Sequence, residues 1–237
     1  MGSPDKLKVH GNVFDKYTLD NIDRLSARHL FDEMKSALSI GKEANIFSAA
    51  NGDEEVILKI YRVQSCNFNK MYDYLKQDSR VVGIKKQRRK VIYAWTRREY
   101  RNLMRARDLG VNVPTPIEVI DNILVLEFIG EKETPALQLK DLNFKQLGPS
   151  KSKKLFIDVV DYMRKLHKGG LVHGDLSSFN ILYHNSKPVF IDFSQSTIKN
   201  NFQYEELLDR DVRNISSFFS KKGIETDEES LKKMITS

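Results

Sequence analysis

The chain has 237 residues, of which 40% are hydrophobic and 30% charged, enough for one domain with a substantial core or for a small two-lobed one. Its formal net charge of +7 permits a polyanionic partner such as RNA without demanding one. The single cysteine, Cys66, excludes a disulfide within the chain, and no apolar run approaches the roughly 18 residues of a membrane span, so we expect a cytoplasmic protein.

The N-terminal segment 1–35 is predicted to be a helical extension. Residues 1–13 are polar, whereas apolar residues recur at near-helical spacing from Thr18 to Met34. Ser26 is a potential N-cap that divides this pattern into two short helices. We expect both helices to pack on the segments that follow, with a DNA-reading helix-turn-helix as the less favoured interpretation.

Residues 38–47 predict two strands joined by a glycine turn, which would place backbone N–H groups over phosphates. The triplet at 51–53 predicts a second hairpin turn, into a strand over residues 56–61. Lys59 lies in the middle of that apolar strand, where a lysine destabilises unless it is paired. Lys59 is therefore either an edge-strand lysine that extends its head to solvent or a phosphate-binding lysine, which needs a carboxylate on a following helix.

Residues 62–93 show little periodicity and contain a strongly basic run. We expect a mobile loop over about 78–92, with Gly83 near its middle. The basic residues form either a solvated face or a surface that binds a partner or RNA. They are Lys85, Lys86, Arg88, Arg89 and Lys90.

Residues 94–109 predict a helix that Gly110 closes. Glu99 shares one face of this helix with Leu103 and Ala106, which is the geometry needed for a carboxylate to reach Lys59. Two prolines then indicate a loop. Residues 123–130 predict a buried strand that runs into a linker, so we place a domain boundary after residue 128.

The stretch from 171 to 194 follows a predicted helix over 149–167 and places polar residues between apolar runs. Two short β-rich runs surround the turn formers at 184–186, which predicts a tight hairpin. Asn180 begins the first strand and Asp192 follows the second. Both side chains should therefore emerge at one end of the hairpin, with Asp175 in the loop just upstream.

Asp175, Asn180 and Asp192 are residue types that phosphoryl transfer from ATP requires. Mg²⁺ takes hard oxygen ligands, and a carboxylate accepts the hydroxyl proton or orients the nucleophile. Protein kinases carry His-Arg-Asp, four residues, Asn, and later Asp-Phe-Gly. Here His-Gly-Asp has the same spacing to Asn180, and Ser194 replaces the final glycine. The alternative is a surface loop with three unrelated polar residues.

The chain beyond Asp192 is short. Residues 203–220 predict a helix, and the charged last residues predict one more short helix. This is too little chain for a full activation segment and a large helical lobe, so little remains to present a substrate hydroxyl to Asp175.

Segments along nearly the whole chain resemble the RIO family of atypical serine protein kinases, most closely its first subfamily in an archaeal-size version. In order they are IGKEANIFSA, ILKIYR, REYRNL, LVLEFIG, LVHGDLSSFNILYH and PVFIDFSQS. The resemblance implies an α+β fold: a trimmed two-lobed kinase with an antiparallel sheet and helix in an N-lobe over 36–128. The implied fold also has a small helical C-lobe over 129–237 and the helical extension over 1–35.

The same resemblance assigns the central polar residues to ATP and its metal ion. Lys59 would contact the α- and β-phosphates, and Glu99 would hold Lys59. Asp175 would be the catalytic carboxylate. Asn180 and Asp192 would ligate Mg²⁺, with Mn²⁺ as an alternative ion, and Asp192 would also take part in catalysis.

Further residues are implied to surround the nucleotide. Backbone groups of Glu127 and Ile129 would face adenine, and Ser39 and Lys42 would belong to the phosphate loop. Ile40 departs from the family, which usually has threonine there, so one hydroxyl near the phosphates is lost.

The resemblance also implies a function: ATP-dependent serine phosphorylation and autophosphorylation in maturation of the small ribosomal subunit. The implied partners are precursor particles, with their protein and rRNA, and no membrane. We expect autophosphorylation in the 78–92 loop, with Ser79 as first candidate and Ser65 as second. ATPase activity is expected to dominate over phosphorylation of many peptides.

Two other functions compete with this interpretation. Small-molecule phosphotransferases of the aminoglycoside or choline kinase type also carry His-Gly-Asp with Asn five residues after the Asp, but they need a long C-terminal region for the acceptor. A non-catalytic scaffold that binds ATP and pre-ribosomes is the other alternative. The intact Lys59, Asp175, Asn180 and Asp192 argue against a dead site.

Overall fold

The computed structural model describes residues 14–237, so the polar segment 1–13 of the predicted extension lies outside the described residues. The chain divides into two compact units. The first unit contains Met1–Lys76, Val81–Tyr100 and Pro116–Phe128; the second contains Gln77–Arg80, Arg101–Thr115 and Ile129–Ser237. In the part of the chain that the structure describes, no helix has both the length and the apolar character needed to cross a membrane.

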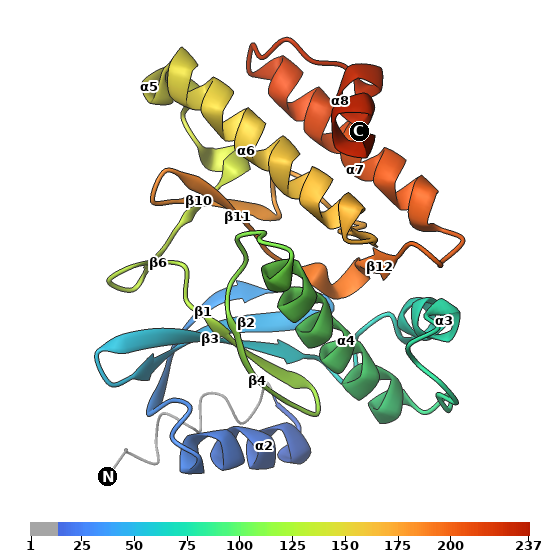
Figure 1. Ribbon diagram of the computed structural model, residues 1–237. Helices are drawn as coiled ribbons and strands as arrows, with labels where there is room; N and C mark the ends of the chain where they lie inside the picture. The colour runs from blue at the N-terminus through green and yellow to red at the C-terminus, as the bar shows by residue number, and fades with distance from the viewer. Residues whose placement is uncertain (1–13) are drawn as a thin grey trace. The chain divides into compact units, whose positions relative to one another are not determined.

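The first unit is built on an antiparallel sheet with strand order β1-β2-β3-β5-β4 (Figure 1). Both predicted hairpins are confirmed, and Gly52 takes a φ of +60° in the second turn, a conformation open to glycine. The strand β4 was not predicted, because the two prolines before and at its start indicated a loop. The strands are β1 Glu33–Ile40, β2 Ala44–Asn51, β3 Glu54–Tyr61, β4 Pro116–Ile120 and β5 Ile123–Glu127.

Helix α2, Lys16–Ala27, packs under one face of this sheet (Figure 1). The Asp15 side chain caps it by accepting the N–H of Thr18 at 2.8 Å. The prediction of a second helix reaching Met34 is wrong. The chain turns at His29, whose φ is +56°, and β1 begins soon after, because Phe31 enters the same buried cluster as the sheet residues.

Helix α3, Phe68–Gln77, was not predicted, and helix α4, Arg88–Asp108, begins inside the loop expected over about 78–92. Only residues 78–87 between them lack helix and strand, rather than 78–92. Met71 and Leu75 of α3 pack with Val91 and Trp95 of α4 in one buried cluster. Only Met71 and Leu75 are buried on α3, and the first two turns of α4 are strongly basic, so the periodic signal was too weak for sequence reasoning.

The second unit packs three long or medium helices together with small sheets (Figure 1). These helices are α6 Pro149–Lys168, α7 Tyr204–Lys221 and α8 Glu228–Thr236, and a single short turn of helix, α5 Phe144–Leu147, precedes them. The three predicted helices are confirmed as α6, α7 and α8. The predicted apolar stripe of α6 is buried, with Leu155, Val159, Met163 and Leu166 all at most 4% exposed.

The predicted hairpin is also confirmed, as β10 Ile181–His184 and β11 Lys187–Phe190. Asn185 and Ser186 form its turn with φ of +48° and +60°, as a two-residue hairpin turn requires. Two-residue strands and short 3₁₀ turns around it were not predicted, because they are too short to carry a period. They are β6 Gly130–Glu131, β7 Thr134–Pro135, β8 Leu137–Gln138, β9 Leu171–Val172, β12 Thr197–Ile198, η1 Leu139–Asp141 and η2 Phe193–Gln195.

Candidate functional site

Lys59 and Glu99 form a buried ion pair in the first unit, as predicted from strand and helix facing. Lys59 Nζ lies 2.7 Å from Glu99 Oε1, and the two side chains are 8% and 1% exposed. Tyr61 donates its hydroxyl to the other carboxylate oxygen, Oε2. Because β3 is the central strand of the sheet, Lys59 is not an edge-strand lysine. A carboxylate on α4 instead fixes one ammonium group on the sheet face opposite α2.

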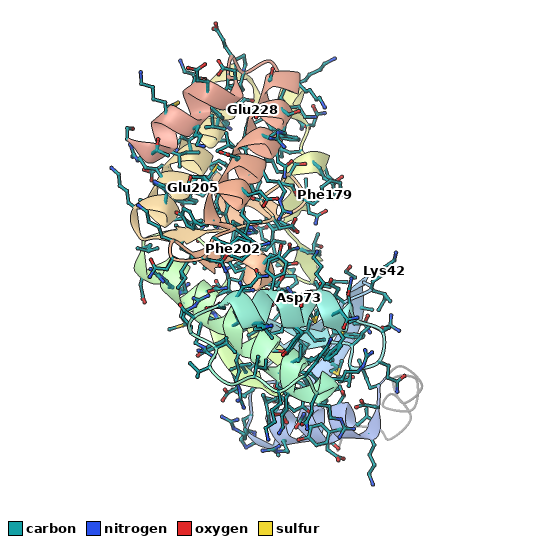
Figure 2. The ribbon with its side chains drawn as sticks, turned by 90° about the vertical axis from the view of Figure 1, so that its right-hand side faces the viewer. Lys42, Asp73, Phe179, Phe202, Glu205 and Glu228 are labelled. Atoms are coloured by element: carbon teal, nitrogen blue, oxygen red, sulfur yellow. The ribbon has the colours of Figure 1, made fainter. Side chains whose placement is uncertain are left out.

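Ser39 lies in the same cross-strand row as Lys59. Ser39 is opposite Ile46 on β2, and Ile46 is opposite Lys59 on β3. Directly opposed residues of antiparallel strands point to the same face, so Ser39 and Lys59 share a face about 10 Å apart. Lys42 extends outward from the tip of the β1–β2 hairpin (Figure 2), and Ile40 beside it is 62% exposed.

Gly41 is required in this hairpin by close backbone approach. It donates its N–H to Ala44 O at 3.0 Å, and a Cβ on Gly41 would lie only 2.8 Å from the same oxygen. Arg62 adds a contact from β3's end, because its backbone N–H donates to Glu43 O at 2.9 Å. Backbone hydrogen bonds therefore fix the conformation of the turn, and Lys42 is exposed at its tip.

Glu127 ends β5 opposite Val56, and Ile129, two residues later, begins the last segment of the second unit. The carbonyl of Ile129 accepts the N–H of Ala136 at 2.9 Å. The Ile129 carbonyl is thus already hydrogen-bonded within the second unit.

In the second unit, Asp211 of α7 holds the loop that contains Asp175. Its two carboxylate oxygens accept the backbone N–H groups of Gly174 at 2.8 Å and Leu176 at 2.7 Å. Residue 174 must be glycine, because its φ is +81° and a Cβ would lie 2.9 Å from a backbone oxygen. Asp175 thus sits between two fixed amides, with its side chain 46% exposed and Oδ1 3.8 Å from Arg210 Nη2.

Asn180 and Asp192 emerge at the same end of the β10–β11 hairpin, as predicted. Ile191 donates its N–H to Asn180 O at 3.0 Å, so Asp192 is the next residue after that bond. The Asn180 side chain donates Nδ2 to the carbonyl of Asp175 at 2.8 Å, which turns its Oδ1 away from that loop. The structure therefore brings Asp175, Asn180 and Asp192 into one loop-and-hairpin constellation.

Asp192 takes a left-handed backbone conformation, with φ of +63° and ψ of +69°. Its Oδ1 accepts the N–H of Ser194 at 3.4 Å, so the serine that replaces the usual glycine keeps a local backbone contact. Carboxylate and amide oxygens are hard ligands that fit Mg²⁺ or Mn²⁺. Within residues 14–237, no three His, Cys, Asp or Glu side chains are grouped to hold a metal ion. An ion at Asn180 and Asp192 would therefore complete its shell with phosphate oxygens and water.

The segment around Asp192 is held by His173, from the loop that contains Asp175, and by Asn102, from α4. His173 is buried, and its Nε2 lies 3.0 Å from Ile191 O. Its ring also packs against Phe193, with centroids 4.6 Å apart. Asn102 donates Nδ2 to the carbonyls of Phe193 and Ser196, at 3.1 and 3.0 Å. These contacts fix the backbone on both sides of Asp192.

Sequence reasoning missed Asp211, although a signal for it exists. Asp211 lies on the buried stripe of α7, four residues after Leu207 and four before Ile215. A carboxylate inside an apolar helical stripe is as conspicuous as Lys59 inside an apolar strand, because a buried charge must be paired or hydrogen-bonded. Asn102 carries a similar signal, since it lies four residues before buried Ala106 on α4.

Comparison with known proteins decides the family. A model of the RIO domain matches residues 45–232 of the chain. The chain belongs to the RIO kinase family. This RIO chain is 39% identical over 233 residues to the RIO-type serine/threonine-protein kinase Rio1 of Haloferax volcanii, covering 98% of the chain and 79% of that relative.

Other RIO relatives extend to eukaryotes. The human serine/threonine-protein kinase RIO1 is 34% identical over 217 residues, covering 90% of the chain and 38% of the human protein. The crystal structure of the Rio2 kinase from Chaetomium thermophilum matches with a TM-score of 0.67 at 21% identity, over 90% of the chain and 66% of that structure. This likeness confirms the predicted α+β, kinase-like fold. Membership implies ATP and a divalent metal ion for this RIO-type serine/threonine-protein kinase.

The buried Asp211 gives the RIO chain a predicted pH dependence. Burial, with a smaller contribution from the nearby Asp175 carboxylate, outweighs the lowering effect of the two backbone bonds and Arg210 and raises the pKa of Asp211 from 3.8 to about 7. A protonated carboxyl would place a hydrogen on an oxygen that already accepts an N–H, and would so release Gly174 or Leu176. We expect kinase activity to rise with pH through about 7.

Stability should change in the opposite direction. Because the folded pKa of Asp211 exceeds its unfolded value, its contribution to the free energy of unfolding is fully present below about pH 4 and is lost as pH rises through about 7. Rate profiles and urea unfolding over this range, for wild type and Asp211→Asn, measure both trends. If the rate falls equally below pH 7 in wild type and in Asp211→Asn, another group controls the pH dependence of the rate.

Proposed function

We propose that this chain is an ATP-dependent serine protein kinase and ATPase of the first, archaeal-like RIO subfamily, acting with Mg²⁺ in maturation of the small ribosomal subunit. The observation that carries the proposal is the constellation of Asp175, Asn180 and Asp192 on one loop and hairpin. The subfamily is supported by archaeal relatives named Rio1, two of which are 39% identical over 98% of the chain.

In this proposal each polar residue has one role in phosphoryl transfer. Lys59, held by Glu99, binds the α- and β-phosphates, and Asp175 accepts the hydroxyl proton or orients the nucleophile. Asn180 and Asp192 hold Mg²⁺ through their oxygens. When bound, this ion would neutralise charge that develops on the phosphates.

The remaining predicted residues complete the proposed nucleotide site. Backbone groups of Glu127 and Ile129 bind adenine, and Ser39 and Lys42 belong to the phosphate loop. We propose that residues 36–128 act as the N-lobe and 129–237 as the C-lobe. The extension over 1–35 contributes α2, which packs on the sheet.

The proposed partners are precursor particles of the small ribosomal subunit, and the proposed location is cytoplasmic. Autophosphorylation is proposed on Ser79, with Ser65 as the second candidate. Both serines are exposed, and Ser79 lies between Asp78 and Arg80, which are paired at 2.6 Å. Mass spectrometry after incubation with Mg-ATP locates the phosphate, and phosphate only outside residues 62–93 contradicts both candidates.

We further propose that the chain works more as an ATP-driven switch than as a kinase of many peptides. Between Asp192 and α7 the chain makes only η2, β12 and a short connection, so little chain remains to dock an acceptor peptide. Water is one acceptor. The Asp192 carboxylate is another: its oxygen would bond to the γ-phosphorus as the bond to ADP breaks, ADP would leave, and water would later cleave the acyl phosphate.

The switch proposal predicts that free phosphate appears faster than labelled protein. Radiolabelled ATP is incubated with the enzyme and a generic acceptor protein, with and without small-subunit precursor particles, and both products are followed. Phosphate release should exceed acceptor labelling and should rise with particles. Faster labelling of the generic acceptor without a particle effect contradicts the switch. Absence of both products from wild type would instead favour the non-catalytic scaffold, and transfer to a small alcohol the phosphotransferase alternative.

A further inference from the structure

Residues 62–93 carry as much net charge as the whole chain. The segment contains nine Lys or Arg and two Asp, a net charge of +7, which equals the formal net charge of all 237 residues. The rest of the chain therefore has a formal net charge of zero. Every residue from 85 to 90 is exposed, and five of these six residues are basic. The positive charge that would attract a polyanion is therefore concentrated on this segment.

Two of these cations lie on a pair of aligned aromatic rings. Phe68 and Tyr72 are one turn apart in α3, with centroids 6.3 Å apart and planes inclined by 21°. The guanidinium of Arg88 lies 5.3 Å from the centre of the Phe68 ring, and Lys86 Nζ lies 5.4 Å from the centre of the Tyr72 ring. Both rings are half-buried, so they belong to the surface as well as to the α3–α4 cluster.

A second, similar stack begins at the adjacent residue of α4. The guanidinium of Arg89 lies 5.0 Å from the centre of the Tyr17 ring. Tyr17 of α2 stacks in turn on Tyr93 of α4, with centroids 6.1 Å apart and planes inclined by 15°. Tyr17 is 38% exposed. The consecutive residues Arg88 and Arg89 thus each lie against an aromatic stack, one within α3 and the other between α2 and α4.

We propose that this surface binds single-stranded RNA. We call it the basic–aromatic face: Tyr17, Phe68, Tyr72, Lys85, Lys86, Arg88, Arg89 and Lys90. The cations would neutralise phosphates, and unpaired bases would stack on the rings and on the flat outer sides of the guanidinium groups. An acidic protein would use the cations alone and would gain nothing from aligned rings, and a duplex hides its base faces.

The inference deepens the partner part of the proposed function, because it specifies how the RNA of a precursor particle would be held. Its test uses isolated RNA and no ATP. A failure to bind RNA therefore leaves the phosphoryl-transfer proposal intact. A failure of ATP turnover, measured separately, leaves this inference intact.

The first experiment measures the electrostatic contribution to RNA binding. A short labelled oligouridylate is titrated by fluorescence anisotropy at several salt concentrations, with wild type expected to give a slope of log K against log salt of about −3.5 for five neutralised phosphates. Replacing Lys85, Lys86, Arg88, Arg89 and Lys90 by Ala should bring the slope close to zero. The matched control removes the same charge from exposed lysines elsewhere, namely Lys132, Lys145, Lys151, Lys153 and Lys233. Equal losses in both variants overturn the proposal.

The second experiment measures how much base stacking on the rings contributes to RNA affinity. Phe68→Leu and Tyr72→Leu keep apolar bulk and should each weaken binding by about 5- to 150-fold with the salt slope unchanged. Phe202→Leu is the control, since Phe202 is a 77% exposed ring on the second unit (Figure 2). Should a leucine variant fail to fold by circular dichroism, Arg88→Lys keeps the charge but removes the flat guanidinium, and should weaken binding about two- to fivefold.

Two further ligands distinguish the alternatives. Duplex RNA of the same length and a polyglutamate peptide are titrated under the same conditions. Binding of the single strand should be the tightest of the three and alone sensitive to the ring variants. Ring variants within twofold of wild type, or polyglutamate binding as tight as RNA, would overturn single-stranded RNA as the ligand and favour an acidic protein partner.

Discussion

Asp175→Asn is expected to lower kcat by about 10²- to 10⁴-fold, the contribution of a positioned general base. The fold should survive the change because the loop is held through its backbone. Asp211 accepts the N–H groups of Gly174 and Leu176, and Asn180 donates to the carbonyl of Asp175. An isosteric amide at position 175 keeps all three bonds and loses only the carboxylate.

The measurement pairs turnover with two checks on integrity. Phosphate release and acceptor labelling give kcat, while ATP affinity and the unfolding midpoint should stay close to wild type. Asp158→Asn is a matched control, because it also neutralises one carboxylate of the second unit, on α6, whose partner Lys154 is 63% exposed. Turnover of Asp175→Asn within threefold of wild type would remove Asp175 from the catalytic role.

The elements that sequence predicted well share a strong period or a distinctive turn. α6 and α7 have apolar stripes that are buried as expected, and the β10–β11 hairpin has turn residues that accept positive φ. Lys59 and Glu99 were paired correctly from one physical fact, that a lysine inside an apolar strand needs a carboxylate. Burial of a charge is thus a more informative sequence signal than a single motif residue.

The elements that sequence missed depend on tertiary packing. α3 buries only two residues and the first turns of α4 are dense in charge, so their helicity rests on a few residues, such as Met71 and Trp95, that lie in one buried cluster. The chain after α2 forms a strand because Phe31 joins the sheet core, although its spacing suited a helix. The apolar stripe of α7 indicates that Asp211 is buried, but its partners are backbone groups 35 residues or more before it, and no local pattern identifies them.

The Lys59–Glu99 pair carries the other large expected effect, on stability as well as on turnover. Removal of one partner leaves a buried charge without its counter-ion, which typically destabilises by about 3–5 kcal/mol. Lys59→Ala and Glu99→Gln should therefore each lower the free energy of unfolding severely. Tyr61→Phe should have a smaller effect, because it removes only the hydroxyl that binds Glu99 Oε2 and leaves the ion pair in place.

The double variant tests whether the two residues act as one unit. Once Lys59 has been replaced, Glu99→Gln should cause little further loss, because the carboxylate no longer has an ammonium group to hold. The coupling free energy from the cycle should therefore be close to the loss of one single variant, about 3 kcal/mol in urea unfolding, and turnover of ATP should be non-additive in the same direction. The same cycle with Lys35 and Glu55, a more exposed pair at 3.0 Å in the same sheet, is the control and should give a coupling below about 1 kcal/mol. Additive losses at Lys59 and Glu99 would mean that the two residues affect stability and turnover independently, in spite of the 2.7 Å between Nζ and Oε1.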